Sequence, residues 1–187
     1  MTSQLVGPRS EGMLKKLLRS ARVTICKQGV EQILTAERDG VKARTYCMMV
    51  DTSRAPEFID ITEGVGGFVR DSRVLNGIAV VYSKHTTAAI KINENEPLLL
   101  KDMEDFLERV ASRNGYYQHN DFSVRTVNMT EDECPNGHAH CQHLLLGTSE
   151  TIPIINGHLQ FGRRQRIFLV ELDMPRSREV MVQILGE

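Results

Sequence analysis

The sequence predicts an α+β fold in one domain, with a largely antiparallel arrangement of strands. Three observations support this. A strongly β-branched run follows the Asn76-Gly77 turn, an amphipathic helical pattern spans residues 96–111, and Asn156-Gly157 separates two short β-rich runs. The 187 residues fit a single domain with a core large enough to fold alone. Alternating groups of strands and helices indicate an α+β domain rather than a parallel α/β domain.

The first 40 residues differ from the rest and are predicted to be an N-terminal extension of unknown function. Met13, Leu14, Leu17 and Leu18 recur at helical spacing between basic residues, which indicates a short amphipathic helix. A membrane-surface or partner-binding role for this helix is the less favoured interpretation. The Asp39-Gly40 turn signal ends the extension, and residues 41–187 form the predicted domain.

The first half of this domain predicts strands at 45–50 and 58–61, then a helix that Thr62 caps. A buried strand follows Asn76-Gly77 and ends near Lys84. Residues 86–94 alternate small or polar side chains with isoleucines, a period of two that is typical of another strand.

The second half begins with the helix over 96–111, which has Pro97 in its first turn. Its predicted buried stripe consists of Leu99, Met103, Phe106, Leu107 and Val110. The runs TIPII and HLQFG flank Asn156-Gly157 and predict a hairpin. RIFLVELD and EVMVQILGE are two further predicted strands.

Composition excludes several classes of function. The 23 basic and 24 acidic side chains give a net charge of −1, without the basic excess of nucleic-acid-binding proteins. No apolar run approaches the ~20 residues that span a bilayer. The first residues are polar and lack the apolar segment of a secretory signal. We therefore expect a cytoplasmic protein that binds neither nucleic acid nor membrane.

The four cysteines form no CxxC motif, which argues against a zinc ribbon or a thioredoxin-type site. Cys134 and Cys141 lie in a histidine-rich stretch and are possible ligands there. Reduced structural thiols are the favoured interpretation, because free cysteine is commonly buried.

That stretch, residues 128–162, holds four of the six histidines. A strand would put His138 and His140 on one face, whereas a helix capped by Asn136 and ended by Gly147 would put His140 and His143 on neighbouring turns. The helix is favoured. Either geometry brings two imidazoles together, but metal sites normally need three or four ligands, so another must come from elsewhere.

His85 and His119 are the candidates for that further ligand. His85 ends a predicted strand and is followed within ten residues by hydroxyl, amide and carboxylate groups: Thr86, Thr87, Asn93, Glu94 and Asn95. So many hydrogen-bonding groups indicate a wet or ligand-binding cavity. The alternative, a capped turn at Asn95 before the helix, explains one of these residues and not the others.

Several motifs, in order, resemble the YjbQ-like family, also described as the secondary thiamine-phosphate synthase family: HTTAAIKINENE, YYQHNDFSVRTVNMTEDE, NGHAH, LLLGTSETIPIINGHLQFG and VQILGE. The resemblance runs from about residue 45 to 187. It implies a mostly antiparallel β-sandwich with two main helices, assembled as a homotrimer with polar clefts between subunits. One departure concerns a Gly-x-Trp-Gln pattern, where this chain has Arg164 in place of tryptophan.

The resemblance also implies the site. His85, His119 and His140 would bind metal or substrate. Asn93 and Glu94 would lie nearby and share a catalytic role with Thr86 and Thr87. Weaker candidates are His138, Asp121, Arg125, Glu131 and Gln165. Arg125 is a possible phosphate ligand, although a solvated arginine is more common, and Glu131 belongs to an acidic run that is either a partner for His140 or a solvated loop.

Three functions remain open: a thiamine-phosphate-synthase-type enzyme, a metal-dependent hydrolase or lyase on a small phosphorylated metabolite with Glu94 as base, and a non-catalytic trimeric ligand-binding protein. Histidine ligands favour zinc or another transition metal over magnesium, which prefers oxygen. No GxxxxGK[ST] phosphate loop is present.

Overall fold

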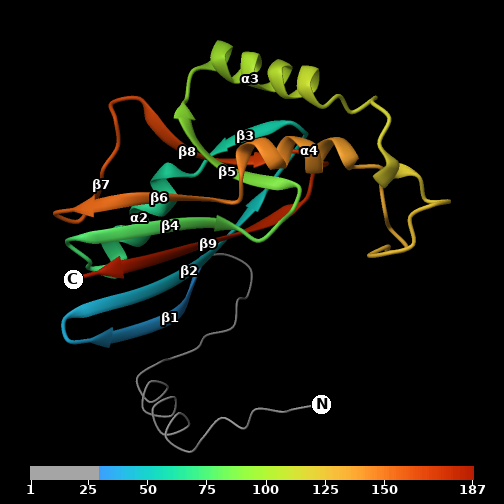
Figure 1. Ribbon diagram of the computed structural model, residues 1–187. Helices are drawn as coiled ribbons and strands as arrows, with labels where there is room; N and C mark the ends of the chain where they lie inside the picture. The colour runs from blue at the N-terminus through green and yellow to red at the C-terminus, as the bar shows by residue number, and fades with distance from the viewer. Residues whose placement is uncertain (1–29) are drawn as a thin grey trace, which may run out of the picture.

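The computed structural model describes residues 30–187, which form two antiparallel sheets with helices on them (Figure 1). The six-stranded sheet has the order β1 (Val30–Arg38), β2 (Val41–Asp51), β9 (Ser177–Gly186), β4 (Gly77–Ser83), β6 (Ser149–Ile155) and β7 (His158–Leu159). The three-stranded sheet has the order β3 (Glu57–Asp60), β8 (Gln165–Glu171) and β5 (Ala88–Glu94). The predicted α+β fold is confirmed.

The three-stranded sheet is covered on both faces. On one face, Ile167 and Leu169 of β8 join the main core with the six-stranded sheet and α2 (Thr62–Ser72). On the other face, Phe168 packs in a second core with α3 (Pro97–Val110) and α4 (Gly137–Leu146). Burial on both sides explains why the middle of β8 is a continuous apolar run rather than an alternating one.

The helices differ from prediction in two details. Thr62 is not the cap of α2; Ile61 holds that position, and the Thr62 hydroxyl accepts a hydrogen bond from the Ile167 amide at 2.8 Å. In α3 only Leu107 of the predicted stripe is buried, and Phe106 and Val110 are half exposed. Of these five side chains, only Leu107 belongs to the second core. In residues 30–187, no helix has both the length and the apolar character that a membrane crossing requires.

The segment assigned to the N-terminal extension contributes a strand. Asp39 and Gly40 both have positive φ, 53° and 83°, and form the turn between β1 and β2, as their sequence predicts. β1 therefore adds an edge strand to the six-stranded sheet. The helix expected around Met13–Leu18 lies outside the described residues.

A buried ion pair connects the two sheets at the end where α4 begins. Glu171, the last residue of β8, and Arg178, near the start of β9, are almost completely buried. Arg178 donates to both carboxylate oxygens, with Nε 2.6 Å from Oε2. Its Nη2 also donates to the Thr87 hydroxyl at 3.1 Å, just before β5.

The remaining acceptor positions of Glu171 are also occupied. Its Oε1 accepts the amides of Leu172 and Asp173 at 3.1 and 3.0 Å, and its Oε2 lies 3.1 Å from the hydroxyl of Thr52, after β2. A buried charge is tolerated when it is paired and its hydrogen bonds are made. The pair thus holds the ends of β2, β5, β8 and β9 together.

We predict that Arg178→Met lowers the free energy of unfolding by about 3–5 kcal/mol, because it leaves the Glu171 carboxylate buried without its counter-charge. Urea denaturation followed by circular dichroism measures the loss. Lys101→Met is the control, because it breaks the exposed Lys101–Asp105 pair on α3 and should barely change stability. Equal effects from the two substitutions would contradict a structural role for the buried pair.

Candidate functional site

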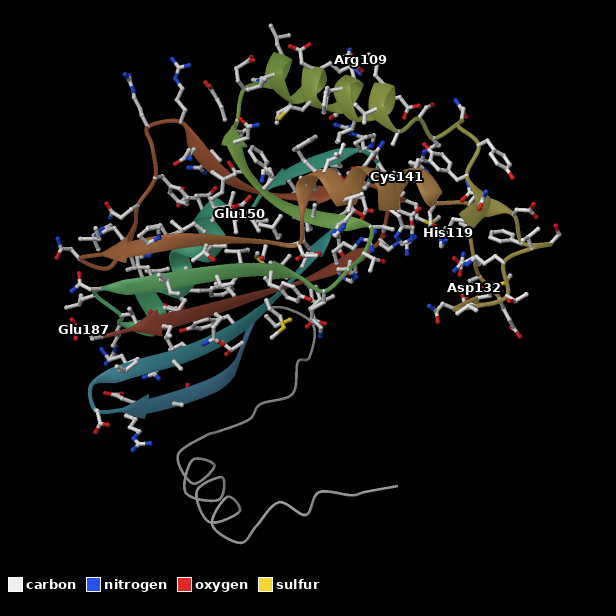
Figure 2. All side chains as sticks on the ribbon, in the orientation of Figure 1. Arg109, His119, Asp132, Cys141, Glu150 and Glu187 are labelled. Carbon is white, nitrogen blue, oxygen red and sulfur yellow. The ribbon has the colours of Figure 1, made fainter. Side chains whose placement is uncertain are left out.

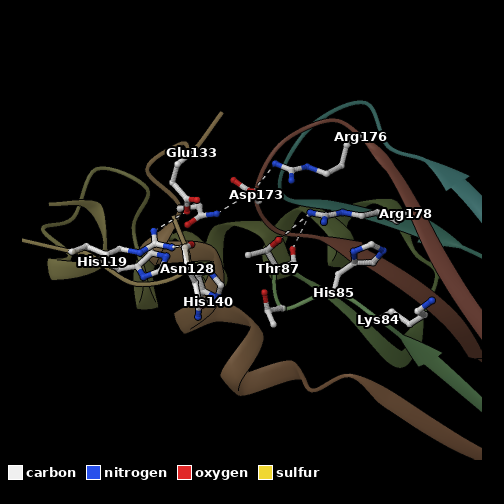
Figure 3. A pocket seen from close by; sticks show the side chains of 13 residues that line it. Lys84, His85, Thr87, His119, Asn128, Glu133, His140, Asp173, Arg176 and Arg178 are labelled. Atoms are coloured by element: carbon white, nitrogen blue, oxygen red, sulfur yellow. Dashed lines mark hydrogen bonds and ion pairs between the residues drawn. The ribbon is translucent and has the colours of Figure 1, made fainter. Parts of the chain in front are cut away.

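A polar cavity of about 500 Å³ lies at this end of the sandwich. Three segments surround it: the turn between β4 and β5, the loop between β8 and β9, and the long connection from α3 into α4 (Figure 3). Its lining is Lys84, His85, Thr86, Thr87, His119, Arg125, Asn128, Glu133, Asn136, His140, Asp173, Arg176 and Arg178. Cationic groups, imidazoles and hydroxyls thus meet in one hollow.

One side of the cavity is built on the buried ion pair. The chain leaves β4 at Ser83, and His85 turns back so that its Nε2 accepts the amide of Glu179 in β9 at 2.9 Å. Burial, and then the positive charge of Arg178, lower the pKa of His85, so its imidazole is neutral near pH 7. Figure 3 shows His85, Lys84, Arg176 and Arg178 on the same side of the cavity.

The opposite side holds a pair of histidines. His119 lies in the short 3₁₀ helix η1 (Gln118–Asn120) and His140 in the first half of α4. Their ring centroids are 4.7 Å apart with the planes at 70°. Burial, and then the neighbouring His119, lower the pKa of His140. The Nε2 of His119 is buried, and within residues 30–187 it has no hydrogen-bond partner.

Acidic groups anchor the loops around the cavity. The Asp173 carboxylate accepts from Arg176 at 2.7 Å and from the Asn136 amide at 3.4 Å, so it connects the β8–β9 loop to the start of α4. Glu133 accepts from Arg125 at 2.7 Å, and this hydrogen bond lowers the pKa of the Glu133 carboxyl. The main role of both carboxylates is therefore to hold the loops around the cavity in place.

The structure brings six predicted site residues to this cavity: His85, His119, His140, Thr86, Thr87 and Arg125. Arg125 is largely committed, because its guanidinium binds Glu133 and the carbonyls of Val127 and Asn128. It fixes the loop, and its remaining capacity to bind a phosphate is small.

Glu94 and Asn93 are not at the cavity. They lie at the far end of β5, about 20 Å away at ~3.3 Å per strand residue. Glu94 is paired with Arg164 at 3.1 Å and lines a separate hollow of about 330 Å³ with Asp60, Asn95, Arg164 and Arg166. Arg164, at the position where the resemblance leads us to expect tryptophan, thus contacts Glu94.

The four remaining candidates lie outside the cavity for local reasons. Asp121 accepts from Ser123 and shapes a turn, and Glu131 is exposed. Gln165 accepts the Gly162 amide at the Glu94 end of β8. His138 is only 2% exposed within α4. Conversely, the cavity includes residues that the sequence analysis did not select: Lys84, Asn128, Asn136, Asp173, Arg176 and Arg178.

The sequence run ELDMPRSR, residues 171–178, could have indicated several of these cavity residues. Glu171 stands inside a β-rich run where a charge is unexpected, and Asp173, Arg176 and Arg178 follow in the next seven residues. A charge in a buried strand has to be paired, so a nearby arginine of opposite sign was the natural partner.

The residues present fit a metal ion only in part. The His119–His140 pair offers two adjacent imidazole rings and one nitrogen that has no hydrogen-bond partner among residues 30–187. His85 lines the same cavity, but its Nε2 is already hydrogen-bonded. Across residues 30–187 no three His, Cys, Asp or Glu side chains are grouped closely enough to hold an ion. Cys134 and Cys141 are exposed and Cys47 is buried, and none of these three forms a disulfide.

We predict that the protein loses stability as pH falls from 7.5 to 5.5. Burial lowers the pKa of four histidines in the folded state: His85, His138, His140 and His143. Unfolded histidines take up protons near pH ~6.5 while the folded rings stay neutral, so protonation favours the unfolded chain below that pH. Urea unfolding at several pH values measures this.

His138→Gln should reduce this pH dependence, since it removes the most buried ring of the four. Replacement of the exposed His158 by Gln is the matched control and should leave the slope intact. Stability that is flat or rises between pH 7.5 and 5.5 would contradict the prediction.

Comparison with known proteins gives the family. Residues 46–187 match the family described as UPF0047 protein YjbQ-like. A UPF0047 protein of Methanothermobacter thermautotrophicus is 42% identical over 136 residues, which are 73% of this chain and 87% of that protein. One of Methanocaldococcus jannaschii is 36% identical over 139 residues, covering 74% and 91%.

Solved structures agree. A YbjQ-like protein of unknown function from Sulfolobus solfataricus P2 superposes with a TM-score of 0.71 at 35% identity, covering 79% of this chain and 99% of that one. A hypothetical protein from Aeropyrum pernix K1 gives 0.68 at 36% identity, covering 76% and 98%. The chain therefore belongs to the UPF0047 YjbQ-like family.

Proposed function

We propose that the polar cavity binds a small phosphorylated metabolite and that its histidine pair holds a divalent transition metal. The observation that carries this proposal is the Nε2 of His119, which has no hydrogen-bond partner among residues 30–187 and lies beside His140 in the same cavity as Lys84 and Arg176. Arginine and lysine are common ligands of phosphate oxygens. Lys84 is paired with Glu179 and Arg176 with Asp173, so both cations are positioned before any ligand arrives.

The chemistry of the ligands favours zinc or a similar ion over magnesium. Imidazole nitrogens suit transition metals, whereas magnesium prefers oxygen. His119 and His140 would supply two ligands, and the bound metabolite or a neighbouring copy of the chain would complete the set. Such an ion polarises a phosphoryl or similar oxygen when bound. The neutral state of His140 supports this proposal, because a protonated imidazole cannot be a ligand.

Group transfer of the secondary thiamine-phosphate synthase type is the activity that we propose for this cavity. Transfer to or from a phosphorylated group needs cations near the developing charge, and Lys84 and Arg176 meet that need. A hydrolase with Glu94 as base has less support, because Glu94 lies at the other end of β5 in the same chain. A purely ligand-binding protein is the remaining alternative.

We also propose a homotrimer in which copies of the six-stranded sheet cover one another. Alternate residues of β4 face outward, and Ile78 and Tyr82 are both exposed. Ile155 of β6 and Leu185 of β9 are exposed large hydrophobic residues of the same sheet. An apolar sheet face of this kind favours a protein partner.

The cytoplasmic location stays a prediction from composition.

His140→Ala should abolish metal binding and lower activity strongly while the protein stays folded, because a half-buried residue at a polar cavity contributes little to the core. Elemental analysis of purified protein gives the metal content, and an assay with the pyrimidine diphosphate and thiazole phosphate substrates gives the activity. Leu144→Ala, an exposed change on the same helix, is the control. A metal-free wild type would exclude the metal; full activity in His140→Ala would exclude a role for this ring.

Ile78→Asp should dissociate the trimer, since a carboxylate cannot be buried unpaired in an apolar interface. Sedimentation velocity at micromolar concentration should show a monomer for this variant and a trimer for the wild type. Leu144→Asp places the same charge on an exposed site of α4, away from the sheet, and should stay trimeric. A monomeric wild type would overturn the proposed assembly.

A further inference from the structure

A second cavity of about 480 Å³ adjoins the polar cavity at the histidine pair. Its lining is Tyr116, Tyr117, Gln118, His119, Gly137, His140 and Cys141. His119 and His140 line both cavities, so the two cavities meet at these two rings. Figure 2 shows Cys141 on α4, with His119 close to the same helix.

This second cavity contrasts with the first in chemistry. None of its lining residues is Lys, Arg, Asp or Glu, whereas the first cavity has six such side chains. Burial raises the pKa of Tyr117, so its phenol stays neutral, and burial lowers the pKa of His140. The lining therefore has no acidic, lysine or arginine side chain and is rich in aromatic rings.

Part of this lining is fixed and part is free to adjust. The Tyr117 hydroxyl donates to the Ser112 carbonyl at 2.8 Å. Its ring packs against the start of α4 so closely that a Cβ on Gly137 would lie 2.5 Å from the Tyr117 Cβ. Tyr116 is instead 83% exposed, an unusual position for an aromatic ring at the edge of a cavity.

We propose that this second cavity is an apolar subsite for the planar, uncharged part of the same ligand whose anionic group occupies the polar cavity. The inference rests on the proposed function and extends it. Ligand sites usually combine an apolar, aromatic lining with a few polar groups, and neither cavity alone has that composition. Together they have it, with the histidine pair at the junction.

The two linings also determine which end of the ligand lies in which cavity. An anion held by Lys84 and Arg176 would lie in the first cavity, and a ring stacked on Tyr116 or Tyr117 would lie in the second. The bond that joins the anionic group to the ring would then pass beside His119 and His140. The substrate class is therefore a phosphate ester, or a related phosphorylated compound, of a planar ring.

Calorimetric titration of the intact protein with methyl phosphate and phenyl phosphate tests this. Both probes carry the same anionic group, and only one carries a ring. Phenyl phosphate should bind roughly three- to tenfold more tightly, as expected for one aromatic contact. Tyr116→Ala should reduce this ratio toward one. Phe122→Ala is the control, because Phe122 lies in the same connection but lines neither cavity.

Cys141→Phe provides an independent variant, since it fills the second cavity and should weaken phenyl phosphate more than methyl phosphate. Equal binding of the two probes to the wild type would overturn the proposed subsite, while the proposed phosphate site in the polar cavity would be unaffected. This result is expected if a side chain of a neighbouring copy of the protein fills the second cavity. A preference for phenyl phosphate that survives both variants would also overturn the subsite. If neither probe binds, the proposed function fails and the subsite fails with it.

Discussion

The structure depends on one buried ion pair. Glu171 and Arg178 lie where the two sheets meet, and their hydrogen bonds reach Thr52 and Thr87 on two further strand ends. Because a buried carboxylate and guanidinium must keep their partners, these four chain segments cannot separate independently. Arg178 and its partner Thr87 line the cavity, so the ion pair that holds the two sheets together also fixes the position of this part of the cavity lining.

The cavity gathers residues from segments that are far apart in the sequence. His85 comes from the turn after β4, His140 from α4, and Arg176 from the loop before β9. The connection between α3 and α4 adds His119, and the Arg125–Glu133 pair holds that connection in shape. Rigid elements thus supply one side of the site and a pinned loop supplies the other.

Much of the fold was predictable, because periodicity and turn chemistry are local. The Asn156-Gly157 hairpin, the strand after Gly77 and the helix ended by Gly147 all occur as predicted. Local patterns fail where tertiary packing decides: the Phe106 side of α3 faces outward. The convergence of His85, His119 and His140 on one cavity was predicted through the family resemblance, whereas the distance of Glu94 follows from the direction of β5, which sequence motifs do not encode.

The hydrogen bond between the Glu179 amide and His85 Nε2 has a consequence for proton chemistry. A main-chain N–H can only donate, so the neutral imidazole of His85 must carry its proton on Nδ1. This ring is therefore held in one tautomer by the Glu179 amide of β9, with Nδ1 as its donor. Among residues 30–187 the buried Nε2 of His119 has no hydrogen-bond partner, so no such bond fixes the tautomer of that ring, and it can exchange the roles of proton donor and acceptor.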